Sequence, residues 1–166
     1  MMVQLREADK AQVRPVSKVL RQLERLVSGF NYGITLDVKA LELPGAELPL
    51  NEVMRTCYPE SQPHLAKVRQ VSLEELTTDV ETCLRYEGEA HAGPRFTAAR
   101  REKLEQELLP AFWRALAELI SSEEAELHDY PDERGLPGYR VFWSFTYVLH
   151  HRTRRRCVVI TGSASD

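Results

Sequence analysis

Two adjacent β-strand patterns near the C-terminus constrain the fold more than any other feature of the chain. Over residues 139–150, alternate positions form two faces; one is wholly apolar, formed by Val141, Trp143, Phe145, Tyr147 and Leu149. The other face also contains apolar bulk, from Phe142 and Val148. This pattern therefore predicts an inner strand that is covered on both sides. Residues 156–162 follow a basic turn and are rich in β-branched side chains, which favours a second strand paired against the first.

Weaker patterns upstream predict two further strands and several helices. Apolar and polar residues alternate over 31–39, and Leu127 and Tyr130 mark a short strand over 125–130. Apolar residues recur at helical spacing in four segments, 15–27, 51–57, 72–84 and 97–119. We therefore expect one α+β domain over residues 1–166, with an antiparallel sheet of about four strands packed with several helices.

Local signals indicate where these helices begin and bend. Pro15 suits the first turn of its helix, and Asn51 and Thr97 are expected as N-caps. Ser72 and Glu75 have the spacing of a capping box. Pro110 is expected to bend the longest helix, whose inward positions are Leu104, Leu108, Phe112, Leu116 and Leu119.

The composition predicts a soluble intracellular protein. The 22 basic and 25 acidic residues give a net charge of −3, so a charged partner must be recognised by a local patch. The three cysteines lack the spacing of a disulfide framework, which favours a reducing compartment. The polar segment Met1–Asp9 is followed by no apolar stretch, so no secretory signal is expected. The longest apolar run, Val141–Leu149, is too short for a bilayer span, so no membrane partner is expected.

The dense basic cluster lies in the turn 150–156 and has two interpretations. Its arginines are candidates for contacts with phosphates or acidic surfaces: Arg152, Arg154, Arg155 and Arg156. Alternatively, they are solvated charges at a hairpin tip that discourage aggregation. A single turn neutralises few phosphates, so we expect no direct sequence-specific nucleic-acid binding.

An acidic segment precedes the main strand and contains Asp129, Asp132 and Glu133 in a loop with proline and glycine. A metal site formed by these residues and His128 is weighed and disfavoured, because the spacing matches no metal-binding motif. Glu123 and Glu124 are expected at a helix start after Ser122. The chain contains no nucleophile elbow and no phosphate-binding glycine loop, so we expect neither an enzyme nor a cofactor.

Several of these segments together resemble one known family. A helix containing Leu109-Pro110-Ala111-Phe112-Trp113 is followed by an acidic link containing Tyr130. After this link come Trp143-Ser144-Phe145, then Tyr147, a basic pair and a β-branched run that ends in serine. This order is similar to the C-terminal region of the Maf-one family, the general repressor of RNA polymerase III. Residues 20–35 are weakly similar to an earlier helix and box of the family. The family's N-terminal box and its serine-rich variable segment have no counterpart in the sequence.

The resemblance implies a repressor that binds RNA polymerase III and hinders initiation dependent on TFIIIB. It implies nuclear and cytoplasmic localisation and a response to nutrients and stress. Its polymerase-binding candidates are Asp129, Asp132, Glu133, Arg152, Arg154, Arg155 and Arg156, and its fold-signature residues are Trp113, Tyr130, Trp143, Ser144, Phe145 and Tyr147. An adaptor or inhibitor unrelated to transcription is the alternative.

The resemblance also predicts two structural relationships. The Trp113 helix is expected to pack on the sheet that contains Trp143, and Tyr130 is expected to lead directly into that sheet. Both tryptophans are expected in the core rather than in a base-stacking role, because they lie on a helical stripe and a two-faced strand.

Overall fold

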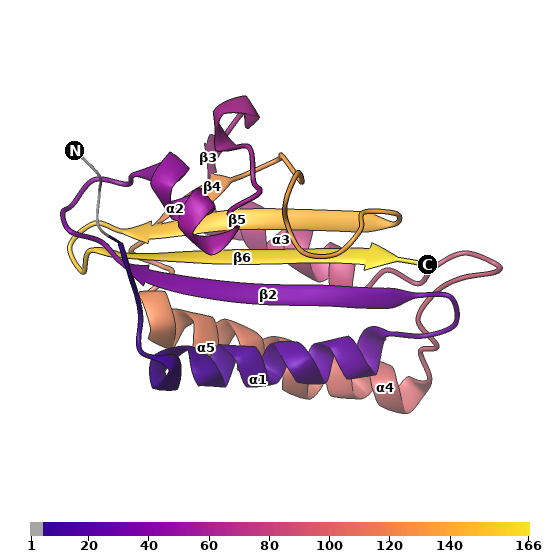
Figure 1. Cartoon of the computed structure of the whole chain (residues 1–166). Coiled ribbons are helices and arrows are strands. Elements are labelled where there is room, and N and C mark those ends of the chain that lie inside the picture. The colour runs from indigo at the N-terminus through magenta and orange to yellow at the C-terminus, as the bar shows by residue number, and fades with distance from the viewer. Residues whose placement is uncertain (1–4) are drawn as a thin grey trace.

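Six antiparallel strands form one sheet in the computed structural model, which describes residues 5–166. Their spatial order is β1-β2-β6-β5-β4-β3 (Figure 1). The bounds are β1 Arg6–Glu7, β2 Gly33–Glu42, β3 Arg69–Val71, β4 Glu126–Asp129, β5 Trp143–His151 and β6 Arg156–Ser165. The α+β class and all four expected strands are confirmed. The two additional strands, β1 and β3, contain only 2 and 3 residues and show no period in the sequence.

The β5–β6 hairpin forms the centre of the sheet, as the sequence predicts. β6 pairs with β2 along its whole length and with β5 from Trp143 to His151. β5 begins at Trp143 and not at residue 139, because the amides of Val141 and Phe142 both donate to the carbonyl of Ala164 and interrupt the ladder. Val141 is therefore 53% exposed, and Phe142 packs on the helical side with Tyr32.

Three long helices cover one face of the sheet, as Figure 1 shows for α1 and α5 along its lower side. The helical bounds are α1 Lys10–Val27, α2 Leu50–Cys57, α3 Leu73–Leu84, α4 Ala98–Lys103 and α5 Leu109–Ile120. The short helix α2 and a 3-10 turn, η1 Pro63–Leu65, belong to the opposite side. Each face therefore has its own apolar cluster, as the two-faced pattern of β5 requires.

Two of the four expected helix starts are confirmed. The hydroxyls of Ser72 and Thr97 each accept from the amide three residues on, at 3.1 Å. The Glu75 side chain does not complete the capping box, because it is bound by Arg69.

The other two starts are wrong. α1 begins five residues before Pro15, because Asp9 accepts from the Ala11 amide and caps the helix there. α2 begins at Leu50 after an N-cap residue, Pro49, so Asn51 lies inside the helix.

The helix expected over 97–119 is divided by a π-helical segment, η2 Leu104–Leu108. Pro110 lies in the first turn of the following helix, α5, and has no N–H to continue an α-helical ladder. The π turn accommodates this gap, since the Leu109 amide donates to the carbonyl of Leu104. The five inward positions predicted for this segment are all buried.

Candidate binding site

The segment 130–142 between β4 and β5, here called the strap, crosses one face of the sheet (the orange loop in Figure 1). Its first amide, that of Tyr130, donates to the carbonyl of Thr146 at 2.9 Å. Gly135 and Gly138 have φ angles of +76° and +81°, which favour glycine. A Cβ at Gly135 would collide with the backbone of Glu60, and one at Gly138 with the Ser163 hydroxyl. The strap is therefore pressed closely against the residues beneath it.

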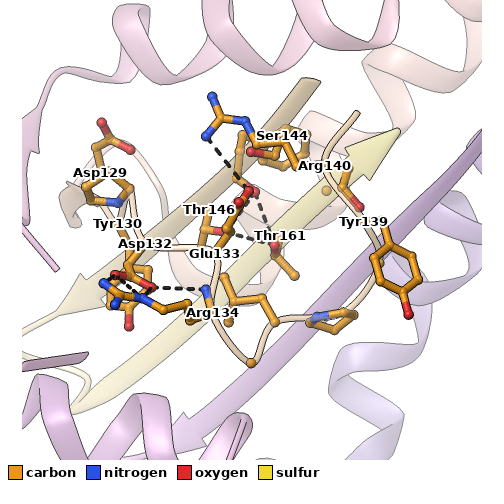
Figure 2. A pocket seen from close by; sticks show the side chains of 18 of the residues that line it. Asp129, Tyr130, Asp132, Glu133, Arg134, Tyr139, Arg140, Ser144, Thr146 and Thr161 are labelled. Atoms are coloured by element: carbon orange, nitrogen blue, oxygen red, sulfur yellow. Dashed lines mark hydrogen bonds and ion pairs between the residues drawn. The ribbon is translucent and has the colours of Figure 1, made fainter. Parts of the chain in front are cut away.

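Below the strap, the sheet presents hydroxyl groups where apolar side chains would be expected. They come from alternate positions of β5 and β6: Ser144, Thr146, Thr161 and Ser163 (Figure 2). The Thr146 and Thr161 hydroxyls lie 2.8 Å apart, and the latter also donates to the Phe145 carbonyl. Within the described residues, the hydroxyls of Tyr130 and Ser163 have no hydrogen-bond partner, although these residues are only 1% and 6% exposed. These groups form the polar floor of a cavity of about 520 Å³.

The three acidic candidates all line this cavity, which we call the strap pocket. Asp132 is bound by Arg134, and this guanidinium lowers the pKa of the carboxyl. Glu133 lies 3.8 Å from Arg140 (Figure 2). The structure therefore gathers the predicted acidic residues and adds two arginines.

Asp129 shares its nearest cation with another carboxylate. Its nearest cation, Arg69, lies 3.6 Å away and is bound more closely by Glu75, at 2.6 Å. Burial raises the pKa of Asp129, and the neighbouring carboxylates of Asp79 and Glu75 add to this effect, while Arg69 opposes it. Within the described residues, Asp129 therefore forms one ion pair, and it shares that cation with Glu75.

The basic candidates lie at the opposite end of the β5–β6 hairpin, and the structure does not bring them to the strap pocket. Arg152 binds Glu47 and Glu126, at 2.9 and 3.2 Å. Arg156 binds Glu42 at 3.0 Å and the carbonyl of Leu119 at 3.1 Å.

The other two arginines of this turn remain on the surface. Arg154 and Arg155 are exposed and form no ion pair within residues 5–166. The four arginines therefore do not act as one patch, because two of them join distant parts of the chain.

The histidines of the basic turn are buried rather than exposed. His151 lies 3.1 Å from Glu124 through Nε2, and its Nδ1 accepts from the amide of Arg154.

The helix start expected at Glu123 and Glu124 is wrong, because these residues lie in a turn that leads into β4.

The fold-signature residues occupy structural positions. The predicted packing of the Trp113 helix is confirmed, whereas Tyr130 leaves the sheet at the end of β4 instead of leading into it. The α5 helix of Trp113 packs in the same apolar cluster as Trp143, and the indole of Trp113 donates to Glu81 at 3.4 Å. Tyr130 follows β4 directly and enters the cluster on the opposite face. Phe145 stacks on Trp143 at 5.9 Å, and the hydroxyl of Tyr147 donates to Asp79.

The possible metal ligands and the thiols are expected from the sequence to play no chemical role, and the structure gives the following facts about them within residues 5–166. No group of three or more His, Cys, Asp or Glu residues there is arranged to hold a metal ion. Burial raises the pKa of the Cys57 and Cys83 thiols to about 12, so both are protonated at neutral pH. None of the described helices is long and apolar enough to cross a membrane.

Several pocket residues were not predicted as functional. The sequence does contain a signal for the hydroxyl groups of the pocket floor: along one face of β6, the side chains change from apolar, at Cys157 and Val159, to hydroxyl-bearing, at Thr161 and Ser163. Arg134 and Arg140 give no such signal, because their role depends on the path of the strap.

The fold of the chain is similar to that of solved structures. No protein-family model and no curated protein matches it. The similar solved structures include two crystal structures of citrus MAF1. The first has a TM-score of 0.62 and 18% identity, and the match covers 92% of this chain and 97% of that chain. The second has a TM-score of 0.58 and 16% identity, covering 89% of this chain and 99% of that one. The architecture described above is thus a MAF1-like fold.

Proposed function

We propose that the chain represses transcription by RNA polymerase III, by binding the polymerase and hindering TFIIIB-dependent initiation. The observation that carries this proposal is the likeness to citrus MAF1 over 92% of the chain. The Maf-one-like segments found in the sequence support it independently. Trp113 and Trp143 pack in the same apolar cluster, as the resemblance predicts.

The proposed mechanism is steric and electrostatic and requires neither catalysis nor a cofactor. The protein would act in the nucleus, and also reside in the cytoplasm, under nutrient and stress control. Asp129 and Glu133 are the strongest polymerase-binding candidates, because both line the strap pocket and neither is bound as closely as Asp132 is by Arg134. Arg154 and Arg155 form a second candidate surface, whereas Arg152 and Arg156 are engaged within the chain.

Extract-based transcription from a transfer RNA gene tests this proposal, with an RNA polymerase II template as the control. Added protein is expected to reduce the transfer RNA transcript selectively. Reduction of both transcripts, or of neither, would contradict the proposal. The alternative, an adaptor or inhibitor unrelated to transcription, predicts no effect on either template.

A further inference from the structure

We propose that the strap pocket binds an arginine side chain presented by a protein partner. The inference deepens the proposed function and rests on it, since the polymerase would be that partner. It concerns a defined cavity between the strap and the strands β5 and β6, which nothing in the family resemblance predicted.

The floor of the pocket indicates a hydrogen-bonding ligand. Tyr130 and Ser163 are at least nine-tenths buried, and both have hydroxyls without a partner in the described residues. A buried hydroxyl left unpaired is unfavourable. Both residues line the cavity and their hydroxyls are shielded from solvent, so a ligand with several N–H groups that enters beneath the strap would pair with hydroxyls that the fold itself leaves unpaired.

The charges around the pocket favour a cationic ligand over an anion. Its lining contains four carboxylates, from Asp79, Asp129, Asp132 and Glu133, and two guanidinium groups. Both guanidinium groups belong to the strap and are already paired, Arg134 with Asp132 and Arg140 with Glu133. An anion would compete with the strap carboxylates for these guanidinium groups. A cation would meet Asp129, which lies 3.6 Å from Arg69, and Asp79, whose carboxylate accepts from the Tyr147 hydroxyl.

A guanidinium group fits this arrangement better than an ammonium group. It presents five N–H donors in a planar fork that matches carboxylate geometry, and its weak hydration favours partly enclosed sites. The cavity of about 520 Å³ is also within the size range of ligand pockets.

The surroundings favour a peptide segment as the source of this side chain. A second hollow shares Asp79 and Asp129 with the strap pocket and continues past Glu74 and Glu75 of α3. Its four carboxylates outnumber its one guanidinium group, that of Arg69, which Glu75 binds at 2.6 Å. A free cation would use only the pocket, whereas an arginine-bearing segment would extend along this acidic hollow.

Binding of short peptides, followed through the amide NMR signals of the full chain, tests the inference. The probe is an eight-residue peptide of glycine and serine with two arginines, and its control replaces each arginine with neutral citrulline. Agmatine, a free guanidinium compound, tests the alternative source. We expect the arginine peptide to shift the signals of the strap and of residues 144–146 and 161–163, and to bind about tenfold more tightly than either comparison compound.

Two variants localise the binding. Asp129→Asn is expected to weaken binding of the arginine peptide about fivefold to tenfold, and Ser163→Ala to weaken it several-fold. Glu118→Gln, at an exposed position on α5, is the matched control and is expected to bind like the wild type. The inference is overturned if citrulline binds equally, if agmatine binds as tightly as the peptide, or if Asp129→Asn has no effect.

Polymerase binding by the same variants separates the two proposals. A wild-type protein that binds the polymerase but not the arginine peptide would overturn the pocket inference alone. A protein that binds the arginine peptide but not the polymerase would overturn the proposed function and leave the arginine specificity of the pocket in place.

Discussion

The indole N–H of Trp143 donates a hydrogen bond to the hydroxyl of Tyr32, 2.6 Å away and 111 positions earlier in the sequence. Tyr32 immediately precedes β2, and Trp143 begins β5, so the bond spans β6, which lies between these strands. Both residues are buried, and Tyr32 also packs against Phe142. The bond therefore fixes the end of the sheet where the strap rejoins β5.

Replacing this hydroxyl is expected to destabilise the fold. Tyr32→Phe leaves the buried indole N–H without an acceptor, so the free energy of unfolding should fall by about 1–3 kcal/mol. Urea denaturation measures this change. Tyr139→Phe is the control, since Tyr139 is 81% exposed and its loss of a hydroxyl should leave stability within about 0.5 kcal/mol. Equal effects of both substitutions would contradict the assigned role of the bond.

The strap is expected to be sensitive to a side chain at Gly138. Gly138→Ala introduces a Cβ that collides with Ser163 at a positive φ angle, so stability should fall by about 1–3 kcal/mol. Gly33→Ala is the matched control, because a Cβ at Gly33 meets no atom within 4 Å. Thermal denaturation of both variants measures the difference. An unchanged melting temperature for Gly138→Ala would show that the strap is not held against β6.

The arginines of the basic turn are expected to divide into structural and surface residues. Arg156→Ala removes contacts with Glu42 and Leu119 and should destabilise the fold by about 1–2 kcal/mol. Arg154→Ala should change stability by less than about 0.5 kcal/mol, because this exposed side chain forms no ion pair within residues 5–166. Chemical denaturation tests this contrast, which disappears if the four arginines are equivalent solvated charges.

Two carboxyls of the strap pocket are expected to affect the pH dependence of stability with opposite signs. The folded pKa of Asp129 is raised, so its ionised form destabilises the fold at neutral pH, and this effect is lost as the pH falls through the folded pKa. The folded pKa of Asp132 is lowered, so its ionised form stabilises the fold above the unfolded pKa, and this contribution is lost as the pH falls through the folded pKa.

Substitution of each carboxyl measures its contribution. At pH 7, Asp129→Asn should be more stable than the wild type and Asp132→Asn less stable, and both differences should decrease near pH 3. Urea denaturation at both pH values provides the comparison. Stability changes of the same sign at pH 7 would contradict the assigned charge environment.

The central hairpin was predictable because its signal is local. Alternation through β5 and the β-branched residues of β6 indicated their pairing, and the helical spacing around Phe112 indicated the buried side of its helix. The start of β5 was placed too early, since Val141 continues the apolar alternation although it lies outside the ladder.

The candidate site was only partly predictable because its residues meet through tertiary structure. The acidic residues of the strap are visible as a sequence cluster, but Ser163 joins them only when β6 lies beneath the strap. Similarly, Arg152 and Arg156 resemble free surface charges until Glu47 and Glu42 are brought next to them. Such long-range partners leave no local period in the sequence.

Direct binding of the purified protein to its cognate RNA polymerase III tests the central claim, with RNA polymerase II as the comparison. Selective binding is expected at micromolar or lower concentration, weakened by Asp129→Asn and unchanged by Glu118→Gln. Absence of binding at micromolar concentration, or equal binding to both polymerases, would contradict it.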